Sequence, residues 1–289
     1  MNSLQVWITA ARPKTLCASV SPVILGSILA FSEGAFNPLL FLFTLITALG
    51  IQISTNLAND YFDYLKGADT ADRKGPLRVT QAGLVSLFTM KKAILYSLSL
   101  TALAGLYLAL QGGLFIAGLL AFSLILAVLY TAGPYSLAYL GLGDLFVFFF
   151  FGPVAVLGTY YLQTGKFSWD AALVGLSIGA ISTAIICVNN LRDIGEDALV
   201  GKKTLAVRFG KTFAKMEYLG CLCLAGMIPY FFLFTHPFTL FSLLFLFPAF
   251  ACLRSIFTYQ DPRELNIILV KTGKLLLIYT ILFSLGWIL

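Results

Sequence analysis

Nine long apolar stretches dominate the sequence and constrain its fold more than any other feature. A helix that crosses a bilayer needs about 20 mostly apolar residues, and nine stretches approach or reach that length. They are residues 16–31, 37–58, 93–110, 114–130, 142–162, 171–188, 217–235, 238–257 and 272–289. Charged residues make up only 11% of the chain, against about 25% in soluble domains, which excludes an ordinary soluble enzyme. We predict an all-α polytopic bundle of nine transmembrane helices in a lipid bilayer, forming one domain over residues 1–289.

The distribution of basic residues predicts the orientation of this bundle. Cytoplasmic loops of membrane proteins carry an excess of Lys and Arg. With nine spans and a cytoplasmic N-terminus, 18 of the 19 basic residues fall on the cytoplasmic side, and only Lys166 falls outside. The net charge of +6 is therefore explained by topology, and we expect no nucleic-acid partner. No cleavable signal peptide or transit peptide is apparent, which favours a bacterial plasma membrane.

Two of the cytoplasmic loops are long and polar, and they are the expected place for chemistry. They cover residues 59–92 and 189–216, follow the second and sixth spans, and hold 12 of the 19 basic residues. The connections between the other spans are short. We therefore predict that an active site forms where these two loops meet the helices that enter them.

Each of these loops begins with an amide side chain followed by carboxylates at helical spacing. In the first, Asn56, Asp60 and Asp63 lie at i, i+4 and i+7, and Asn59 is four residues before Asp63. In the second, Asn189, Asp193 and Asp197 are four residues apart. Both helix ends therefore present oxygen ligands along one stripe. Solvated loop charges that only set topology do not explain this match.

The surroundings of the carboxylates predict a metal-bridged phosphate site. Clustered carboxylates near a bilayer repel one another and are costly to desolvate. Mg²⁺ is a natural counter-ion, since it is usually held by one or two carboxylates together with substrate phosphates. Basic residues lie beside both motifs: Lys66, Arg73, Lys74 and Arg78 near the first, and Arg192, Lys202 and Lys203 near the second. Carboxylates mixed with Lys and Arg indicate a phosphate or diphosphate ligand rather than a pathway for cations.

With these motifs the sequence resembles the UbiA superfamily of membrane prenyltransferases. That family carries Asn-Asp-x-x-Asp after its second helix and Asp-x-x-x-Asp after its sixth, matched here by Asn59-Asp60-x-x-Asp63 and Asp193-x-x-x-Asp197. Further stretches are similar to the members that act on 1,4-dihydroxy-2-naphthoate. These are Arg12-Pro-Lys-Thr-Leu16, Lys66-Gly-Ala-Asp69-Thr, Arg73-Lys-Gly-Pro76-Leu-Arg78, Gly141-Leu-Gly-Asp144-Leu-Phe-Val, Gly152 to Tyr161 and Asn189-Asn-Leu-Arg-Asp193. The likeness runs from about residue 7 to residue 212.

Two departures from the family pattern bear on the site. Many members have a third Asp four residues after the second Asp of the first motif, where this chain has Gly67, with Asp69 two residues further on. The loop at residues 131–143 also lacks the basic residue that some members carry there. A diphosphate contact from this loop would have to come from Tyr135, Ser136 or Tyr139.

The resemblance implies a reaction, a cofactor and roles for particular residues. It implies transfer of a polyprenyl group from polyprenyl diphosphate to 1,4-dihydroxy-2-naphthoate with loss of CO2, giving demethylmenaquinol in menaquinone biosynthesis. Mg²⁺ would be held by Asn59, Asp60, Asp63, Asp193 and Asp197. The diphosphate would be bound by Lys66, Arg78, Arg192 and Lys202. The implied catalytic residues are Asp63, Asp193, Lys66 and Arg192.

Three other functions compete with this interpretation. A related prenyltransferase could act on 4-hydroxybenzoate or homogentisate, and the loop stretches argue against these acceptors without excluding them. A secondary transporter would place its acids near the midplane on broken helices, whereas these acids lie at the cytoplasmic mouths. A CDP-alcohol phosphotransferase would carry an Asp-Gly and Ala-Arg signature beside its Asp-x-x-x-Asp motif, and this sequence lacks it.

Overall fold

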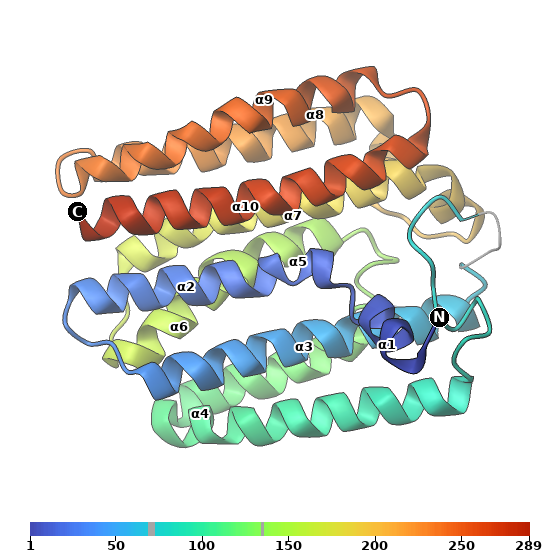
Figure 1. The fold of residues 1–289 in the computed structure, drawn as a ribbon, viewed down its shortest axis with the longest axis horizontal. Coiled ribbons are helices and arrows are strands. Elements are labelled where there is room, and N and C mark those ends of the chain that lie inside the picture. Colours follow the sequence, from blue (N-terminus) through green and yellow to red (C-terminus); the bar gives the residue numbers. More distant parts are fainter. Residues whose placement is uncertain (69–72, 134–135) are drawn as a thin grey trace.

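The computed structural model describes residues 1–68, 73–133 and 136–289, and every regular element in these ranges is helical. The elements are α1 (Ser3–Ala11), η1 (Pro13–Thr15), α2 (Cys17–Ser32), α3 (Pro38–Leu65), α4 (Leu87–Leu129), α5 (Gly143–Phe149), η2 (Phe150–Val154), α6 (Ala155–Thr164), α7 (Trp169–Leu199), α8 (Leu205–Met227), η3 (Ile228–Phe232), η4 (Pro237–Phe245), α9 (Leu246–Thr258), η5 (Pro262–Glu264) and α10 (Leu265–Ile288). The long helices lie roughly side by side (Figure 1). The prediction of an all-α bundle is confirmed.

The candidate membrane spans agree with the nine apolar stretches. Within the described residues, six helical segments are long and apolar enough to cross a bilayer, and the α1–η1 pair joined to α2 at a 54° bend is a seventh. One of the six, α4, contains two of the predicted stretches, 93–110 and 114–130. The remaining stretch, 217–235, lies on α8 and η3, where charged residues in the first half of α8 lower the hydropathy of the helix. Each predicted stretch therefore lies on a helical rod, and the chain is a multi-pass membrane protein.

The two arms of α4 meet at a glycine. Gly113 has a φ of +67° and a ψ of −162° inside the continuous assignment from Leu87 to Leu129. This backbone conformation is accessible to glycine at little cost, because glycine has no Cβ. Figure 1 shows the chain reversing its direction there, so that α4 forms a helical hairpin packed along α3. The break between the predicted spans 93–110 and 114–130 is confirmed.

Polar side chains fix the starts of four long helices. Asn37 accepts hydrogen bonds from the amides of Leu39 and Leu40 at the start of α3, and Pro38 occupies the first helical position. Ser86, Ser168 and Thr204 accept from backbone amides of the first turns of α4, α7 and α8. The first amides of a helix lack partners within the helix, so each such cap satisfies one of them.

Helix α7 lies at the centre of the bundle and brings the segment from α5 to α6 close to itself. In its most apolar 18-residue window 78% of the residues are buried, against 11–28% in α3, α4, the α5–α6 segment and the η4–α9 segment. Gly175 and Gly179 permit this approach, because a Cβ on Gly179 would lie 2.2 Å from the carbonyl oxygen of Phe148. Opposite them, η2 is a π-helical turn containing Gly152 and Pro153. Such turns widen a helix locally and re-orient its side chains.

Three connections meet at one end of the bundle. Figure 1 shows the segments that follow α3, α4 and α7 at the same end as the N-terminus, and the connection from α6 to α7 at the opposite end. Both predicted active-site loops are among these three segments. The third segment, residues 130–142, connects α4 to α5.

We expect the end with the three connections to face the cytoplasm, because it carries the excess of basic residues. The exposed positions Ala82, between α3 and α4, and Lys166, between α6 and α7, lie at opposite ends of the bundle. In a background without the five native cysteines, Ala82→Cys should react with a membrane-impermeant maleimide only in inverted vesicles. Lys166→Cys should react only in intact cells. Labelling of both positions from the same side would contradict the topology.

Candidate active site

The two acidic motifs are brought together through contacts between their loops. Arg73, in the segment after α3, lies 3.6 Å from the Asp193 carboxylate of α7. The backbone amide of Lys74 donates a 2.9 Å hydrogen bond to Glu196. The two motifs, about 130 positions apart in the sequence, thus share one site. This agrees with the prediction that both loops lie on the same side of the membrane and form one active site. Asp69 lies outside the described residues.

The two carboxylates of the first motif have different kinds of partner: Asp60 binds backbone amides, and Asp63 binds a side chain. Asp60 is 1% exposed, and its two oxygens accept hydrogen bonds from the amides of Val79 and Thr80 at 3.1 and 3.0 Å. Asp63 instead forms an ion pair with Arg78 at 3.2 Å. Asp60 therefore fixes the backbone that positions Arg78. Asn59 accepts a hydrogen bond from the hydroxyl of Thr131.

The second motif is organised by a buried arginine. Arg192 is 1% exposed and forms two 2.7 Å hydrogen bonds to the Asp193 carboxylate, one from Nε and one from Nη2. Its Nη1 donates to Asn266 of α10, and Nη2 also donates to Asn189. Because its donors are taken up within the protein, Arg192 fixes the orientation of Asp193.

Asp197 and Lys202 form the third acid–base pair. Lys202 Nζ lies 3.2 Å from Asp197 Oδ1. Burial lowers the pKa of Lys202, but Asp197, Asp63 and Asp193 outweigh that effect and raise the pKa above its ordinary value. The other oxygen of Asp197, Oδ2, is buried and has no hydrogen-bond partner among the described residues. This oxygen is therefore available to a ligand.

Lys66, predicted to bind diphosphate, contacts the loop between α4 and α5 instead. Its Nζ donates to the carbonyl oxygens of Thr131 and Gly133 at 2.6 and 2.9 Å and to Ser136 Oγ at 3.0 Å. These contacts use all three donors of an ammonium group. Nζ also lies 3.8 Å from the centre of the Tyr139 ring. Burial lowers the pKa of Lys66, and Asp63 partly opposes this effect.

Tyr139 links this loop to both motifs. Its hydroxyl donates a 3.2 Å hydrogen bond to Asp63, and its backbone carbonyl accepts one from the amide of Lys203 at 3.0 Å. Of the three residues named as diphosphate contacts from this loop, Ser136 and Tyr139 thus contact protein groups, and Tyr135 lies outside the described residues.

The site is electrically balanced and its donor set suits Mg²⁺. Asp63, Asp193 and Asp197 are each paired with a cation, which offsets the cost of burying a carboxylate. Among the described residues, no three His, Cys, Asp or Glu side chains converge closely enough to hold a metal ion by themselves. Carboxylate and amide oxygens are nonetheless ligands that Mg²⁺ accepts together with substrate phosphates, and Asp197 Oδ2 is one such oxygen without a partner.

A cavity of about 340 Å³ extends from this charged end into the bundle. Asn59, Asp63, Arg78 and Lys202 line it, whereas Lys66 and Arg192 do not. Its wall also includes a large apolar portion, formed by Leu108, Ile116, Leu119, Leu120, Phe150 and Leu162 among others. The shape of this space and its chemistry match a molecule with a charged head and a long apolar tail.

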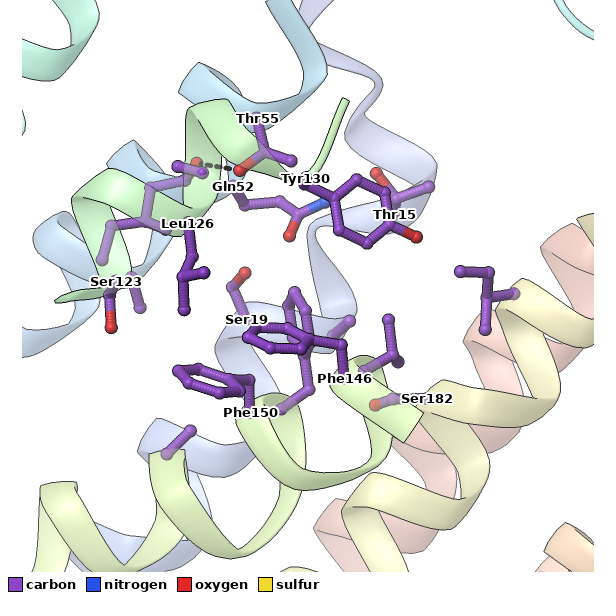
Figure 2. Close-up of a pocket in the computed structure, with 18 of the residues that line it drawn as sticks. Thr15, Ser19, Gln52, Thr55, Ser123, Leu126, Tyr130, Phe146, Phe150 and Ser182 are labelled. Carbon is purple, nitrogen blue, oxygen red and sulfur yellow. Dashed lines mark hydrogen bonds between the residues drawn. The ribbon is translucent and has the colours of Figure 1, made fainter. Parts of the chain in front are cut away.

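Part of the cavity has polar and aromatic walls, and we call this part the slot. Figure 2 shows Thr15, Gln52 and Tyr130 on one side of an open space, with Ser19, Phe146 and Phe150 on the other. The rings of Phe146 and Phe150 are stacked, with centroids 4.3 Å apart. A flat aromatic molecule with hydroxyl groups fits such walls, because rings stack on rings and hydroxyls need polar partners.

The motif analysis missed residues that line this cavity from other elements. Asp144 and Asn190 form a buried pair, in which Asn190 Nδ2 lies 3.0 and 3.2 Å from the two oxygens of Asp144. A signal for Asp144 was present, since it is an acid inside a predicted membrane span. Gln52 and Tyr130 carried no such signal, because single polar residues are common in apolar helices.

The fold and the site thus define an all-α multi-pass membrane protein with two acidic motifs above a cavity that is charged at one end and apolar at the other. The sequence model of the UbiA prenyltransferase family matches residues 19–282, so the chain belongs to that family.

Relatives and solved structures agree with this assignment. The chain is similar to the 1,4-dihydroxy-2-naphthoate octaprenyltransferase of Escherichia coli, with 38% identity covering 99% of this chain and 96% of that protein. The protein of the same name from Mycobacterium tuberculosis is 36% identical, covering 97% of this chain and 96% of that protein. A UbiA homolog from Archaeoglobus fulgidus bound to GPP and Mg²⁺ has the same fold, with a TM-score of 0.65 and 15% identity, covering 98% of this chain and 99% of that one.

The contacts of Asp60 generate a prediction about stability. In Asp60→Asn, the amide NH2 would face one of the two backbone donors, Val79 or Thr80, and leave it unsatisfied. We expect a loss of about 1–3 kcal/mol of stability, measured as a lower thermal unfolding midpoint in detergent. Asp170→Asn, at an exposed position in the first turn of α7, should leave that midpoint close to wild type. A midpoint for Asp60→Asn as high as that of Asp170→Asn would contradict the structural role of Asp60.

Proposed function

We propose that this protein transfers a polyprenyl group from polyprenyl diphosphate to 1,4-dihydroxy-2-naphthoate, with loss of CO2, to give demethylmenaquinol for menaquinone biosynthesis. One observation carries the choice of acceptor: identities of 36–38% over almost the full length of proteins named for that reaction. The cavity supports the reaction type, because its charged mouth, polar slot and apolar wall provide one region for each part of the two substrates.

In this proposal Asn59, Asp63, Asp193 and Asp197 would hold Mg²⁺, which would supply positive charge to stabilise the departing diphosphate. The sequence also placed Asp60 among the ligands. Asp193 likewise has both oxygens hydrogen-bonded, but to the side chain of Arg192, whereas both oxygens of Asp60 bind the backbone amides of Val79 and Thr80. We therefore assign Asp60 to the support of the loop that carries Arg78.

The four predicted diphosphate-binding cations have different roles in this proposal. Arg78 and Lys202 line the cavity and contact the diphosphate. Arg192 orients Asp193, and Lys66 binds Thr131, Gly133 and Ser136 of the connection between α4 and α5. All of these groups are in place before substrate binds, so they stabilise developing charge without reorganising during the reaction.

The chain's own residues then guide the allylic cation to its acceptor. Breakage of the C–O bond leaves a cation next to the polar slot, where Phe146 and Phe150 provide aromatic walls. The apolar part of the cavity wall limits capture of the cation by water. The electron-rich ring of the naphthoate attacks instead, at or next to the carbon that bears the carboxylate.

We further propose a cytoplasmic N-terminus, a single prenyltransferase domain over residues 1–289 and a bacterial plasma-membrane location. The support is the concentration of basic residues at the end of the bundle that holds the site, together with the bacterial relatives. With this orientation the diphosphate and the naphthoate both reach the site from the cytoplasm.

The metal assignment predicts the effect of two conservative substitutions. Asp63→Asn and Asp193→Asn should each lower kcat by about 100-fold or more, because each removes charge from the group that stabilises the departing diphosphate. Turnover is measured with purified protein, Mg²⁺ and both substrates, and Asp170→Asn at the other end of α7 serves as the matched control. Activity near wild type at saturating Mg²⁺ would remove that residue from the ligand set.

The acceptor assignment predicts the fate of the carboxyl carbon. With naphthoate labelled at that carbon, the label should leave as CO2 in step with diphosphate release and appear in no lipid product. A parallel panel of acceptors includes 4-hydroxybenzoate and homogentisate. Label retained in the prenylated product, or faster turnover of another acceptor, would mean that the family is right and the acceptor wrong.

A further inference from the structure

One buried carboxyl group in the cavity wall has no part in the metal and diphosphate site. Asp144 lies in the first turn of α5, is 3% exposed and lines the cavity. None of the ion pairs found among the described residues involves it, whereas Asp63, Asp193 and Asp197 each have a cation within 3.6 Å. A buried carboxylate without a neighbouring cation is costly, so its presence calls for an explanation.

The hydrogen bonds of Asp144 are those of an oriented proton acceptor. The carboxylate accepts hydrogen bonds from its own backbone amide and from one side chain, Asn190 Nδ2, which lies 3.0 and 3.2 Å from its two oxygens. Asn190 itself is buried on α7, one residue after Asn189 of the second motif. This neutral amide fixes the direction of the carboxylate without pairing its charge, and Lys202, the cation that acts on Asp144, forms its ion pair with Asp197. The carboxylate is therefore oriented and remains able to accept a proton.

Asp144 is also close to the slot where we place the aromatic acceptor. A Cβ on the preceding residue, Gly143, would lie 2.9 Å from the hydroxyl oxygen of Tyr130, so this hydroxyl lies against the backbone beside Asp144. Tyr130 and Phe146, two residues after Asp144, lie on opposite sides of the open space in Figure 2. The titratable groups that interact electrostatically with Asp144 are Tyr130 directly after α4, Cys187 of α7, Glu217 and Cys221 of α8, and Lys202.

We infer that Asp144 is a catalytic base that takes the proton from a ring hydroxyl of the naphthoate and later returns it. This inference rests on the proposed function. As the ring carbon that bears the carboxylate forms its bond to the allylic cation, the hydroxyl oxygen becomes a carbonyl and its proton passes to Asp144. The bond to the carboxylate then breaks and releases CO2, its electron pair restores the aromatic ring, and the oxygen recovers the proton from Asp144.

This cycle leaves Asp144 unchanged and exchanges no proton with water. Prenyl diphosphate and naphthoate yield prenylated naphthoquinol, CO2 and diphosphate, so atoms and charges balance. A base that only lends a proton needs no path to solvent, which explains how a carboxyl group buried in the bundle can serve.

The test compares two activities of Asp144→Asn. The variant keeps a hydrogen-bond acceptor for Asn190 but has no base. Transfer to the naphthoate should fall about 100-fold or more, the usual contribution of a general base. Release of diphosphate from prenyl diphosphate without acceptor should stay within about twofold of wild type, because that step does not involve the naphthoate. Asp63→Asn should lose both activities, and Asp170→Asn should lose neither.

The pH profile separates a catalytic role from a structural one. Transfer by Asp144→Asn should rise steadily with pH, because an acceptor that is already ionised needs no base, while Asp144→Glu should keep a profile shaped like that of the wild type. If Asp144→Asn does not insert or fold, Asp144→Ser replaces it in the same comparison. Wild-type transfer rates in the neutral variant, or slow transfer with a wild-type pH profile, would overturn the inference. Failure of the wild-type protein to use the naphthoate at all would instead overturn the proposed function.

Discussion

The neutralisation of buried carboxylates at the edge of a bilayer is the constraint on which this structure depends. Asp63, Asp193 and Asp197 are each below 10% exposed, and burying such charges is costly unless a cation is close. Their partners come from several segments: Arg78 and Arg73 from the loop after α3, Arg192 from α7 and Lys202 from the loop after α7. The same pairs that make burial tolerable therefore join the loops into one site.

The loop between α4 and α5 has a larger role than its composition suggests. Lys66 donates to Thr131, Gly133 and Ser136, and Tyr139 contacts Asp63. These contacts cover the charged site with a segment that brings no cation of its own. This connection therefore places an aromatic ring and backbone carbonyls next to the acidic motifs, while the cations on the cavity wall are Arg78 and Lys202.

Close helix packing also shapes the chemistry deeper in the cavity. Gly175 and Gly179 of α7 allow the π-helical turn at Phe150–Val154 to approach the central helix. Phe150 is the first residue of this turn, and Phe146 lies four residues before it on α5. Their rings stack on each other and form a wall of the slot. Asp144 precedes them at the start of α5, so one short segment contributes both an aromatic surface and a buried acid to the same cavity.

The sequence by itself determined the helical bundle, the positions of its spans and the two acidic motifs, because apolar length and the i, i+4 spacing of polar groups are local properties of the chain. It also indicated that both loops lie on the same side of the membrane, because the number of spans between them and the count of Lys and Arg on each side can be read directly from the sequence. Only the tertiary structure separated the roles of residues that look alike in the motifs. Asp60 contacts backbone amides while Asp63 contacts Arg78, and Lys66 and Arg192 contact protein groups while Arg78 and Lys202 face the cavity. It alone paired Asp144 with Asn190, because hydrogen-bond partners 46 positions apart are decided by how helices pack and not by the residues next to them.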